Sequence, residues 1–405
     1  MSDYTTDGKG QNTMGKKLQP KLRFRGFTDD WEQHKLGSLG TSYSGLSGKD
    51  KTDFGHGSGS YITYLNVFQN PIADIDGTDR IEIDPKQNTV HYGDVFFTVS
   101  SETPEEVGMS SVWFGNQQNI YLNSFCFGYR QNGTFDTKYL AYMLRSRSIR
   151  NRMKVLAQGI SRFNISQRRV MDIEVSFPSM DEQQKIGVLC GKLDQLTDAE
   201  KRKLDLLKQK KKALLHQIFE QKLRFKGYNN PWERRKGSDI IHVRKETNSK
   251  PLTDTVDIEL ENLIEGGGLQ GDISLRTSST SVFREHDTLF GRLRPYLRKF
   301  WLADISGVKS GEIWALFSPT LKSEFLYALT QSAQFLNPAL QTAGTKMPRA
   351  EWKAIAEACF TIPETDEQEK IGQLFRQLEH LTAVETRKID LLSVKKKALL
   401  QKMFV

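Results

Sequence analysis

The chain contains two copies of one 43-residue segment, and this repeat constrains its fold more than any other feature. Residues 177–219 and 362–404 align without a gap, and 24 of the 43 positions are identical. A shorter leading motif, KLRFRGF at residues 21–27, recurs as KLRFKGY at residues 222–228. The order of leading motif, variable region and repeated segment therefore occurs twice. This order predicts a pseudo-twofold molecule in which Val405 lies near the first leading motif.

Each repeated segment has the apolar spacing of a long coiled-coil helix. Apolar residues at intervals of three and four form a stripe in both copies, which we expect to pair the helices or to bind a partner protein: Ile186, Leu189, Leu193, Leu196, Leu204, Leu207 and Leu214, then Ile371, Leu374, Leu378, Leu381, Ile389, Leu392 and Leu399. Glu200 and Glu385 interrupt the stripes at equivalent places, as a stutter does. A helix of about 39 residues is about 58 Å long, too long for one small domain to cover. We therefore expect an antiparallel helix pair; the alternative is that each helix packs on its own domain.

The variable regions combine strand and helix patterns. Residues 61–68, 95–99 and 119–128 alternate or run apolar as strands do, whereas residues 139–152 and 324–336 have helical spacing. The expected fold class is α+β: two α/β domains joined by two long antiparallel coiled-coil helices, with pseudo-twofold symmetry. The expected boundaries are a disordered leader at 1–20, a first domain at 21–176, a central helix at 177–221, a second domain at 222–361 and a C-terminal helix at 362–405.

Charge and cysteine content narrow the class of protein. Lys and Arg outnumber Asp and Glu by 58 to 49, and the net charge of +9 suits a nucleic-acid partner without requiring one. The three cysteines, Cys126, Cys190 and Cys359, stand far apart, so neither a zinc site nor a disulfide framework is expected, and a reducing cytoplasm fits. No apolar run approaches the roughly 20 residues that span a bilayer.

A search for catalytic motifs finds no arrangement that could do chemistry. The glycine-rich residues 53–59 follow a polar segment, whereas a loop that holds S-adenosylmethionine or a dinucleotide follows a strand and opens a helix, so we expect a flexible loop there. Asp/Glu-x-Lys triplets at residues 84–86, 136–138 and 351–353 arise by chance in a chain with 26% charged residues. We expect no catalytic site, no metal site and no cofactor bound by this chain.

Basic and polar loops at equivalent places in the two halves are candidate contacts to nucleic acid. An arginine can bind guanine O6 and N7 through its planar fork, and cations can neutralise phosphates. The candidates in the first half are Ser100, Ser101, Arg162, Asn164, Ser166, Arg168 and Arg169; those in the second half are Arg292, Arg294, Tyr296, Arg298, Lys299, Lys346 and Arg349. The alternative is that these loops are ordinary solvated surface.

These features resemble one protein family. Both long segments begin Pro-x-x-Asp-Glu-Gln-x-Lys-Ile, at residues 178–186 and 363–371, and both contain Lys-Lys-Lys-Ala-Leu-Leu near their ends. With the leading motifs and the divergent regions between them, they are similar to the specificity subunit of type I restriction-modification systems. The resemblance implies two target-recognition domains, each reading one half of a split, asymmetric site in double-stranded DNA.

The resemblance also implies partners. In this family two methyltransferase (modification) subunits bind S-adenosylmethionine and methylate adenine, and two motor-nuclease (restriction) subunits bind ATP and Mg²⁺ and cleave DNA. The present chain is then expected to be non-catalytic. Two other functions stay open: a stand-alone, internally symmetric DNA-binding regulator, and a coiled-coil scaffold that binds only proteins. Copurification separates the three: the first predicts a stable methyltransferase partner, the second DNA binding alone, and the third neither DNA nor a methyltransferase.

Overall fold

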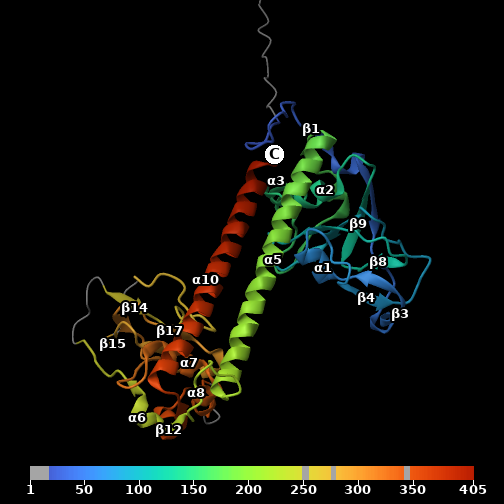
Figure 1. Cartoon of the computed structure of the whole chain (residues 1–405). Coiled ribbons are helices and arrows are strands. Elements are labelled where there is room, and N and C mark those ends of the chain that lie inside the picture. Colours follow the sequence, from blue (N-terminus) through green and yellow to red (C-terminus); the bar gives the residue numbers. More distant parts are fainter. Residues whose placement is uncertain (1–17, 249–254, 275–279, 342–346) are drawn as a thin grey trace, which may run out of the picture. The chain divides into compact units, whose positions relative to one another are not determined.

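The computed structural model describes residues 18–248, 255–274, 280–341 and 347–405. The chain divides into two compact units, a first unit of Met1–Asp198 with Asp390–Val405 and a second unit of Ala199–Ile389. Two helices, α5 (Met180–Phe219) and α10 (Thr365–Lys402), are far longer than the others and contribute residues to both units (Figure 1). Within the described ranges, no helix is both long and apolar enough to cross a membrane.

Two sheets form the first unit. The four-stranded antiparallel sheet has the order β2 (Gly40–Ser44), β9 (Cys126–Gln131), β5 (Val95–Thr98) and β7 (Ser110–Val112). Every residue of β5 is buried, because this central strand packs side chains on both faces. The three-stranded sheet has the order β4 (Thr78–Ile81), β3 (Phe54–Ile62) and β8 (Ile120–Leu122), in which β3 and β8 are parallel.

The second unit repeats this topology. Its four-stranded antiparallel sheet has the order β13 (His242–Val243), β19 (Ile313–Phe317), β16 (Thr288–Gly291) and β17 (Phe300–Leu302). Its three-stranded sheet has the order β14 (Val256–Ile258), β18 (Gly307–Lys309) and β15 (Ser281–Phe283), with β14 and β18 parallel. The two units differ in the third strand, since β4 lies beside the first strand of the parallel pair and β15 lies beside the second.

Short elements connect the sheets to the long helices. In the first unit these are β1 (Glu32–Lys35), η1 (Leu36–Ser38), η2 (Lys51–Asp53), α1 (Tyr64–Gln69), β6 (Ser100–Ser101), α2 (Thr137–Met143), α3 (Arg147–Leu156), β10 (Phe163–Asn164), α4 (Gln167–Met171) and β11 (Glu174–Phe177). In the second unit they are β12 (Glu233–Lys236), α6 (Gly237–Ile240), η3 (Pro295–Leu297), α7 (Ser323–Gln331), α8 (Ala333–Ala339), α9 (Trp352–Glu357) and β20 (Cys359–Ile362). The strands β11 and β20 lie directly before the two long helices in sequence, and each pairs antiparallel with the first strand of its unit, β1 or β12.

One expected strand and one expected loop are wrong. The strand expected at residues 61–68 ends at Ile62, and α1 begins at Tyr64 because the Thr63 hydroxyl accepts a hydrogen bond from a backbone amide of the first turn. The glycine-rich residues 53–59, expected to be a flexible loop, lie largely in β3, whose pairing with β4 shifts register between its two ends.

Two expected helices are each interrupted. The helix expected at residues 139–152 is split into α2 and α3, because Ser146 leaves the helical conformation and its hydroxyl caps α3. The helix expected at residues 324–336 is split into α7 and α8 at Ser332, whose backbone is extended. In both units an apolar face still spans the break, because residues on both sides of it are buried.

Ion pairs define how the two long helices pack. They are Asp194–Lys396 in the first unit and Glu200–Lys388, Lys203–Glu385 and Lys211–Glu379 in the second. Residue numbers fall along α10 as they rise along α5, so the helices are antiparallel, as the repeat predicts. Glu200 and Glu385, which interrupt the apolar stripes, are buried. The pKa of Glu385 lies below its usual range, chiefly because Lys203 donates a hydrogen bond to it.

Most residues of the expected stripes pack inward. Ile186, Ile371, Leu378 and Leu392 are buried, and the half-buried members are Leu189, Leu193, Leu204, Leu207, Leu214, Leu374, Ile389 and Leu399. Leu196 and Leu381, which are equivalent, are 43% and 47% exposed, so the helix pair does not cover them and partner binding stays the prediction for both. Each precedes a buried glutamate by one helical turn, where the stutter moves the stripe around the helix.

The same salt bridge attaches each leading motif to the start of a long helix. Arg23 donates from Nε and Nη2 to the Glu182 carboxylate, both at 2.8 Å, and Arg224 donates to Glu367 at 3.0 and 2.7 Å. Both carboxylates are 1% exposed. The first motif also reaches the end of α10, because the Leu22 amide donates to the Lys402 carbonyl at 2.9 Å.

We predict that Arg23→Met destabilises the first unit by about 3–5 kcal/mol, because it leaves the Glu182 carboxylate buried and unpaired. The double variant Arg23→Met/Glu182→Leu should recover most of this loss. Arg25→Met, which changes an exposed arginine of the same motif, should alter stability by under about 0.5 kcal/mol. Urea unfolding of the four proteins provides the measurement. A double variant as unstable as Arg23→Met would contradict the buried-charge explanation.

Candidate nucleic-acid interface

Three backbone segments of the first unit meet beyond the end of β5. The Val99 amide donates to the Phe125 carbonyl at 3.0 Å, and the Ile165 amide donates to the Val99 carbonyl at 2.9 Å. On the same edge β6 pairs with β10, with Ser100 opposite Asn164. Two loops far apart in sequence, both singled out as candidates, therefore form one surface, which we call the first platform.

The second unit builds the same arrangement, the second platform. The Arg292 amide donates to the Glu312 carbonyl at 2.9 Å, and the Ala350 amide donates to the Arg292 carbonyl at 2.8 Å. Leu293 bridges to Arg349, as Ser100 does to Asn164.

The hydrogen bonds therefore give a residue-by-residue equivalence between the platforms. Val99, Ser100, Phe125 and Asn164 of the first platform correspond to Arg292, Leu293, Glu312 and Arg349 of the second. The backbone is retained while every one of these side chains differs in chemistry.

A buried aspartate precedes each central strand, at the end of the strand opposite the platform. Asp94 accepts from the Nε and Nη2 of Arg130 at 2.8 and 2.7 Å, and from the Tyr43 hydroxyl at 2.7 Å. Asp287 likewise accepts from the Nε and Nη2 of Arg244 at 2.6 and 2.8 Å.

The arginine and its aromatic partner have exchanged strands between the units. Arg130 of β9 lies over the Tyr43 ring of β2 at 5.3 Å, whereas Arg244, just beyond β13, lies over the Phe317 ring of β19 at 4.6 Å. The carboxylate and the cation–π pair are thus retained in both units, but the arginine and the aromatic ring have exchanged strands.

The candidates of the first unit differ in availability. The side chains of Arg162, Asn164, Ser166 and Arg168 belong to exposed residues, and no hydrogen bond or ion pair within the described part of the chain engages them. Ser100 is half-buried. Ser101 does not fit a DNA contact, because it is buried and its hydroxyl donates to the Thr103 carbonyl.

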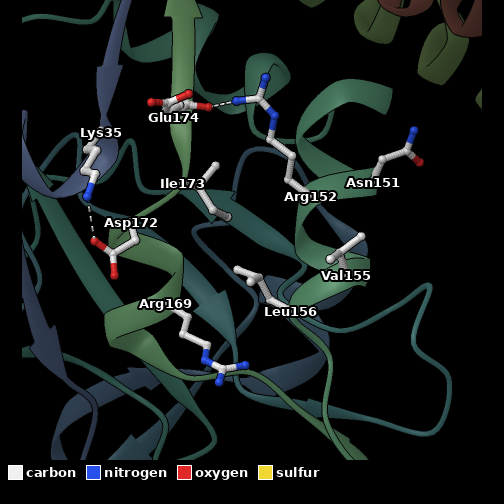
Figure 2. A pocket seen from close by; sticks show the side chains of 9 residues that line it. All are labelled: Lys35, Asn151, Arg152, Val155, Leu156, Arg169, Asp172, Ile173 and Glu174. Atoms are coloured by element: carbon white, nitrogen blue, oxygen red, sulfur yellow. Dashed lines mark hydrogen bonds and ion pairs between the residues drawn. The ribbon is translucent and has the colours of Figure 1, made fainter.

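Arg169 lines a separate pocket rather than the first platform (Figure 2). The apolar part of the lining of this cavity, which has a volume of about 660 Å³, includes Val155, which is 83% exposed. Charged residues also line the cavity, and two of them, Lys35 and Asp172, form an ion pair at 3.3 Å. Across the described residues, no group of three or more His, Cys, Asp or Glu could hold a metal ion.

The basic turn of the second unit presents two arginines from an unusual backbone. Arg294 and Arg298 flank η3 with φ of 53° and 48°, a left-handed conformation that residues other than glycine rarely adopt. Both are exposed, as is Tyr296. Such strain recurs at binding sites.

The remaining candidates of the second unit already have intramolecular contacts. The Lys299 ammonium donates to the Leu260 carbonyl at 2.8 Å. Arg292 is half-buried with its guanidinium 5.7 Å from the centre of the Trp314 ring. Arg349 forms a two-pronged ion pair with Glu312. Lys346 lies outside the described residues.

Two groups near the second platform have shifted pKa values, one because of hydrogen bonds and the other chiefly because of burial. The pKa of Glu312 is lowered, first because Arg349 donates hydrogen bonds to it. The pKa of Lys309 is lowered to about 8, chiefly by burial; the Asp287 carboxylate opposes this shift and the Arg292 cation adds to it. Lys309 is 4% exposed and donates to the Ile313 carbonyl at 2.7 Å.

Sequence reasoning missed Glu312 and Phe125 as parts of the platforms, and it missed the two buried aspartates that precede the central strands. The aspartates carry one signal, the short match of residues 93–97 with residues 286–290. Glu312 and Phe125 carry none, because only the equivalent amide hydrogen bonds identify them.

The fold and one domain match known proteins. Residues 28–209 match the family model described as Type I restriction modification DNA specificity domain. The fold is similar to the type I restriction-modification S subunit from M. genitalium, with a TM-score of 0.62, 15% identity, and coverage of 96% of this chain and 99% of that one. A chain from a structure on complex assembly and conformational transition of the type I restriction-modification system has a TM-score of 0.54 and 16% identity, covering 92% and 97%. No curated protein matches by sequence.

We predict that Lys309→Met stabilises the second unit at neutral pH and that this gain shrinks as pH rises. The pKa of Lys309 is about 8 in the folded unit, against an ordinary value of 10.5. Below pH 8 the folded unit therefore holds a buried charge, which lowers the free energy of unfolding because the unfolded chain keeps the same charge in water. Between about pH 8 and 10.5 the unfolded state binds more protons, so the wild-type free energy of unfolding rises relative to the variant's.

The expected gain at pH 7 is about 2 kcal/mol: about 3 kcal/mol for the pKa shift, less about 1 kcal/mol for the lost hydrogen bond. Urea unfolding of both proteins at pH 7 and pH 10 measures the difference. A gap of the same size at both pH values would show that Lys309 does not titrate in this range.

Proposed function

We propose that the chain is a member of the type I restriction-modification DNA specificity family, whose model matches residues 28–209, and that its two units read the two halves of a bipartite, asymmetric DNA site. The observation that carries the proposal is the pair of platforms, which share a backbone and differ in side chains. A dimeric repressor has identical subunits and therefore reads a palindrome. Two different platforms in one chain suit two different half-sites.

The charge of the platforms supports DNA as the ligand. Arg294 and Arg298 in the second unit, and Arg162 and Arg168 in the first, are exposed cations that can neutralise phosphates. Phosphate contacts fix the position of a protein on the duplex, and base contacts then select the sequence.

The long helices suit the binding of partner proteins. Large apolar side chains are exposed on them: Val188, Leu196, Leu391 and Val394 in the first unit, and Leu206, Leu381 and Val384 in the second. Exposed apolar groups of this kind mark protein interaction sites.

We propose that the partners are two methyltransferase and two motor-nuclease subunits. They would hold S-adenosylmethionine, ATP and Mg²⁺, and the present chain would direct their adenine methylation and DNA cleavage without a catalytic site of its own. The exposed helix residues favour this function over a stand-alone DNA-binding regulator. Methyl transfer by the purified chain alone would contradict it.

We predict that exchanging residues 37–176 for the matching region of a relative changes one half-site and leaves the other intact. Each platform is built within its own unit, so the foreign region should bring its own specificity. Methylome sequencing of cells that express the complex identifies the motif. The reciprocal exchange of residues 238–361 is the matched control and should change only the other half. If either exchange altered both halves, the units would not read independently.

We also predict that four residues inserted after Thr197 widen the gap between the half-sites by about one or two base pairs. The insertion lengthens α5 by about 6 Å and leaves its far end only about 40° from a whole turn, and base pairs stack at about 3.4 Å. The half-sites themselves should not change.

Two inserted residues provide the matched control. They turn the far end of the helix by about 200°, so charged residues face the partner helix and the complex should assemble poorly. The methylated motif is mapped for both variants. An unchanged gap in a well-assembled four-residue variant would mean that another element sets the spacing.

A further inference from the structure

Asn164 and Arg349 occupy the same place on the two platforms. In the first platform Asn164 lies opposite Ser100, and in the second Arg349 lies opposite Leu293. Asn164 is exposed, and the Arg349 side chain is 39% exposed. Equivalent backbone positions with different polar side chains are expected where two half-sites are read differently.

Arg349 is held in one orientation. Its Nε donates to both carboxylate oxygens of Glu312 at 3.1 and 3.0 Å, and its Nη2 donates to Glu312 Oε1 at 2.8 Å. This contact uses one side of the guanidinium. Nη1 has no hydrogen-bond partner within the described residues, and Nη2 keeps its second hydrogen. The edge formed by the two Nη groups therefore remains available, and it is this edge that matches guanine O6 and N7.

Asn164 is fixed through its backbone instead. Its backbone amide and carbonyl exchange hydrogen bonds with the backbone of Gln158 at 2.8 and 2.9 Å, and in β10 it lies opposite Ser100 of β6. No hydrogen bond engages its side-chain amide among the residues that the structure describes. The position equivalent to Glu312 holds Phe125, which is 61% exposed and cannot compete for that amide. A free carboxamide can donate to adenine N7 and accept from adenine N6.

We propose that Asn164 and Arg349 are matched base-reading residues, Asn164 for an adenine in one half-site and Arg349 for a guanine in the other. Both contacts lie in the major groove, where these bases are distinguishable. Glu312 is a positioning residue, because it holds the Arg349 fork before DNA binds and so reduces the entropy lost on binding. This inference rests on the proposed function, since it assumes two half-sites.

The proposal is tested with the full chain in complex with its methyltransferase partner. The motif comes from the methylome, and binding is measured on duplexes that carry each single base change. Arg349→Lys keeps the charge and loses the fork, so discrimination at one G·C pair should fall by about tenfold to a hundredfold. Glu312→Gln should lower discrimination at that same pair, by less. Asn164→Ala should act at one A·T pair of the other half-site.

A matched control is available in the same unit. Arg235 donates to Glu233 from Nε and Nη2 at 3.0 and 2.7 Å, and this exposed pair lies on the separate β12–β20 sheet. Arg235→Lys and Glu233→Gln should leave discrimination at every base unchanged. Thermal unfolding of all variants checks that each is folded.

Three results separate the possible outcomes. Equal weakening by Arg349→Lys on every duplex, with a shallower salt dependence, would make Arg349 a phosphate contact and overturn the proposal. Unchanged discrimination in both Arg349→Lys and Asn164→Ala would overturn it as well. A wild-type motif that is not bipartite would instead overturn the proposed function itself.

Discussion

The buried carboxylates of Glu182 and Glu367 are the contacts on which the architecture depends. Each lies in the first turn of a long helix and is held by an arginine of a leading motif. A carboxylate with 1% exposure cannot recover its hydration, so its arginine must stay in place. The leading motif therefore holds the beginning of each variable region against the helix that follows that region. This closes each domain on itself and leaves the sequence between free to diverge.

The two platforms keep the same backbone while their side chains differ. The same amide-to-carbonyl bonds order both platforms, at Val99 and Phe125 and at Arg292 and Glu312. Backbone hydrogen bonds do not depend on side-chain identity, so the geometry survives when the side chains change. The chemistry that a platform presents can thus alter without a change of fold.

The repeat and its periodicity were sufficient to predict the antiparallel helix pair and the two α/β domains. The hydrophobic pattern predicted the wrong element where a single polar side chain caps a helix: Thr63 caps α1 and so ends a strand, and Ser146 caps α3 and so interrupts a helix. Apolar spacing alone also did not decide whether Leu196 and Leu381 pair the helices or stay exposed, because it does not locate the turn at which a buried glutamate moves the stripe.

The candidate site was predictable only in part. Composition identified the basic turn and the loops before β11 and β20, and these do come together on the platforms. The sequence could not show which side chains are available to bind a ligand, because this depends on partners far away in the chain, such as Glu312, which is 37 residues from Arg349. Ser101 looks like a ligand contact in sequence, yet the backbone of its own loop engages it.

The reversed arginine and aromatic around Asp94 and Asp287 limit how this chain can be shuffled by recombination. A strand moved alone between the units would bring either two aromatics or two arginines to one buried carboxylate. Two aromatics leave the carboxylate without a cation, which costs several kcal/mol. Two arginines crowd one acceptor with like charges. A crossover between the two units that preserves folding must therefore carry both partner strands together.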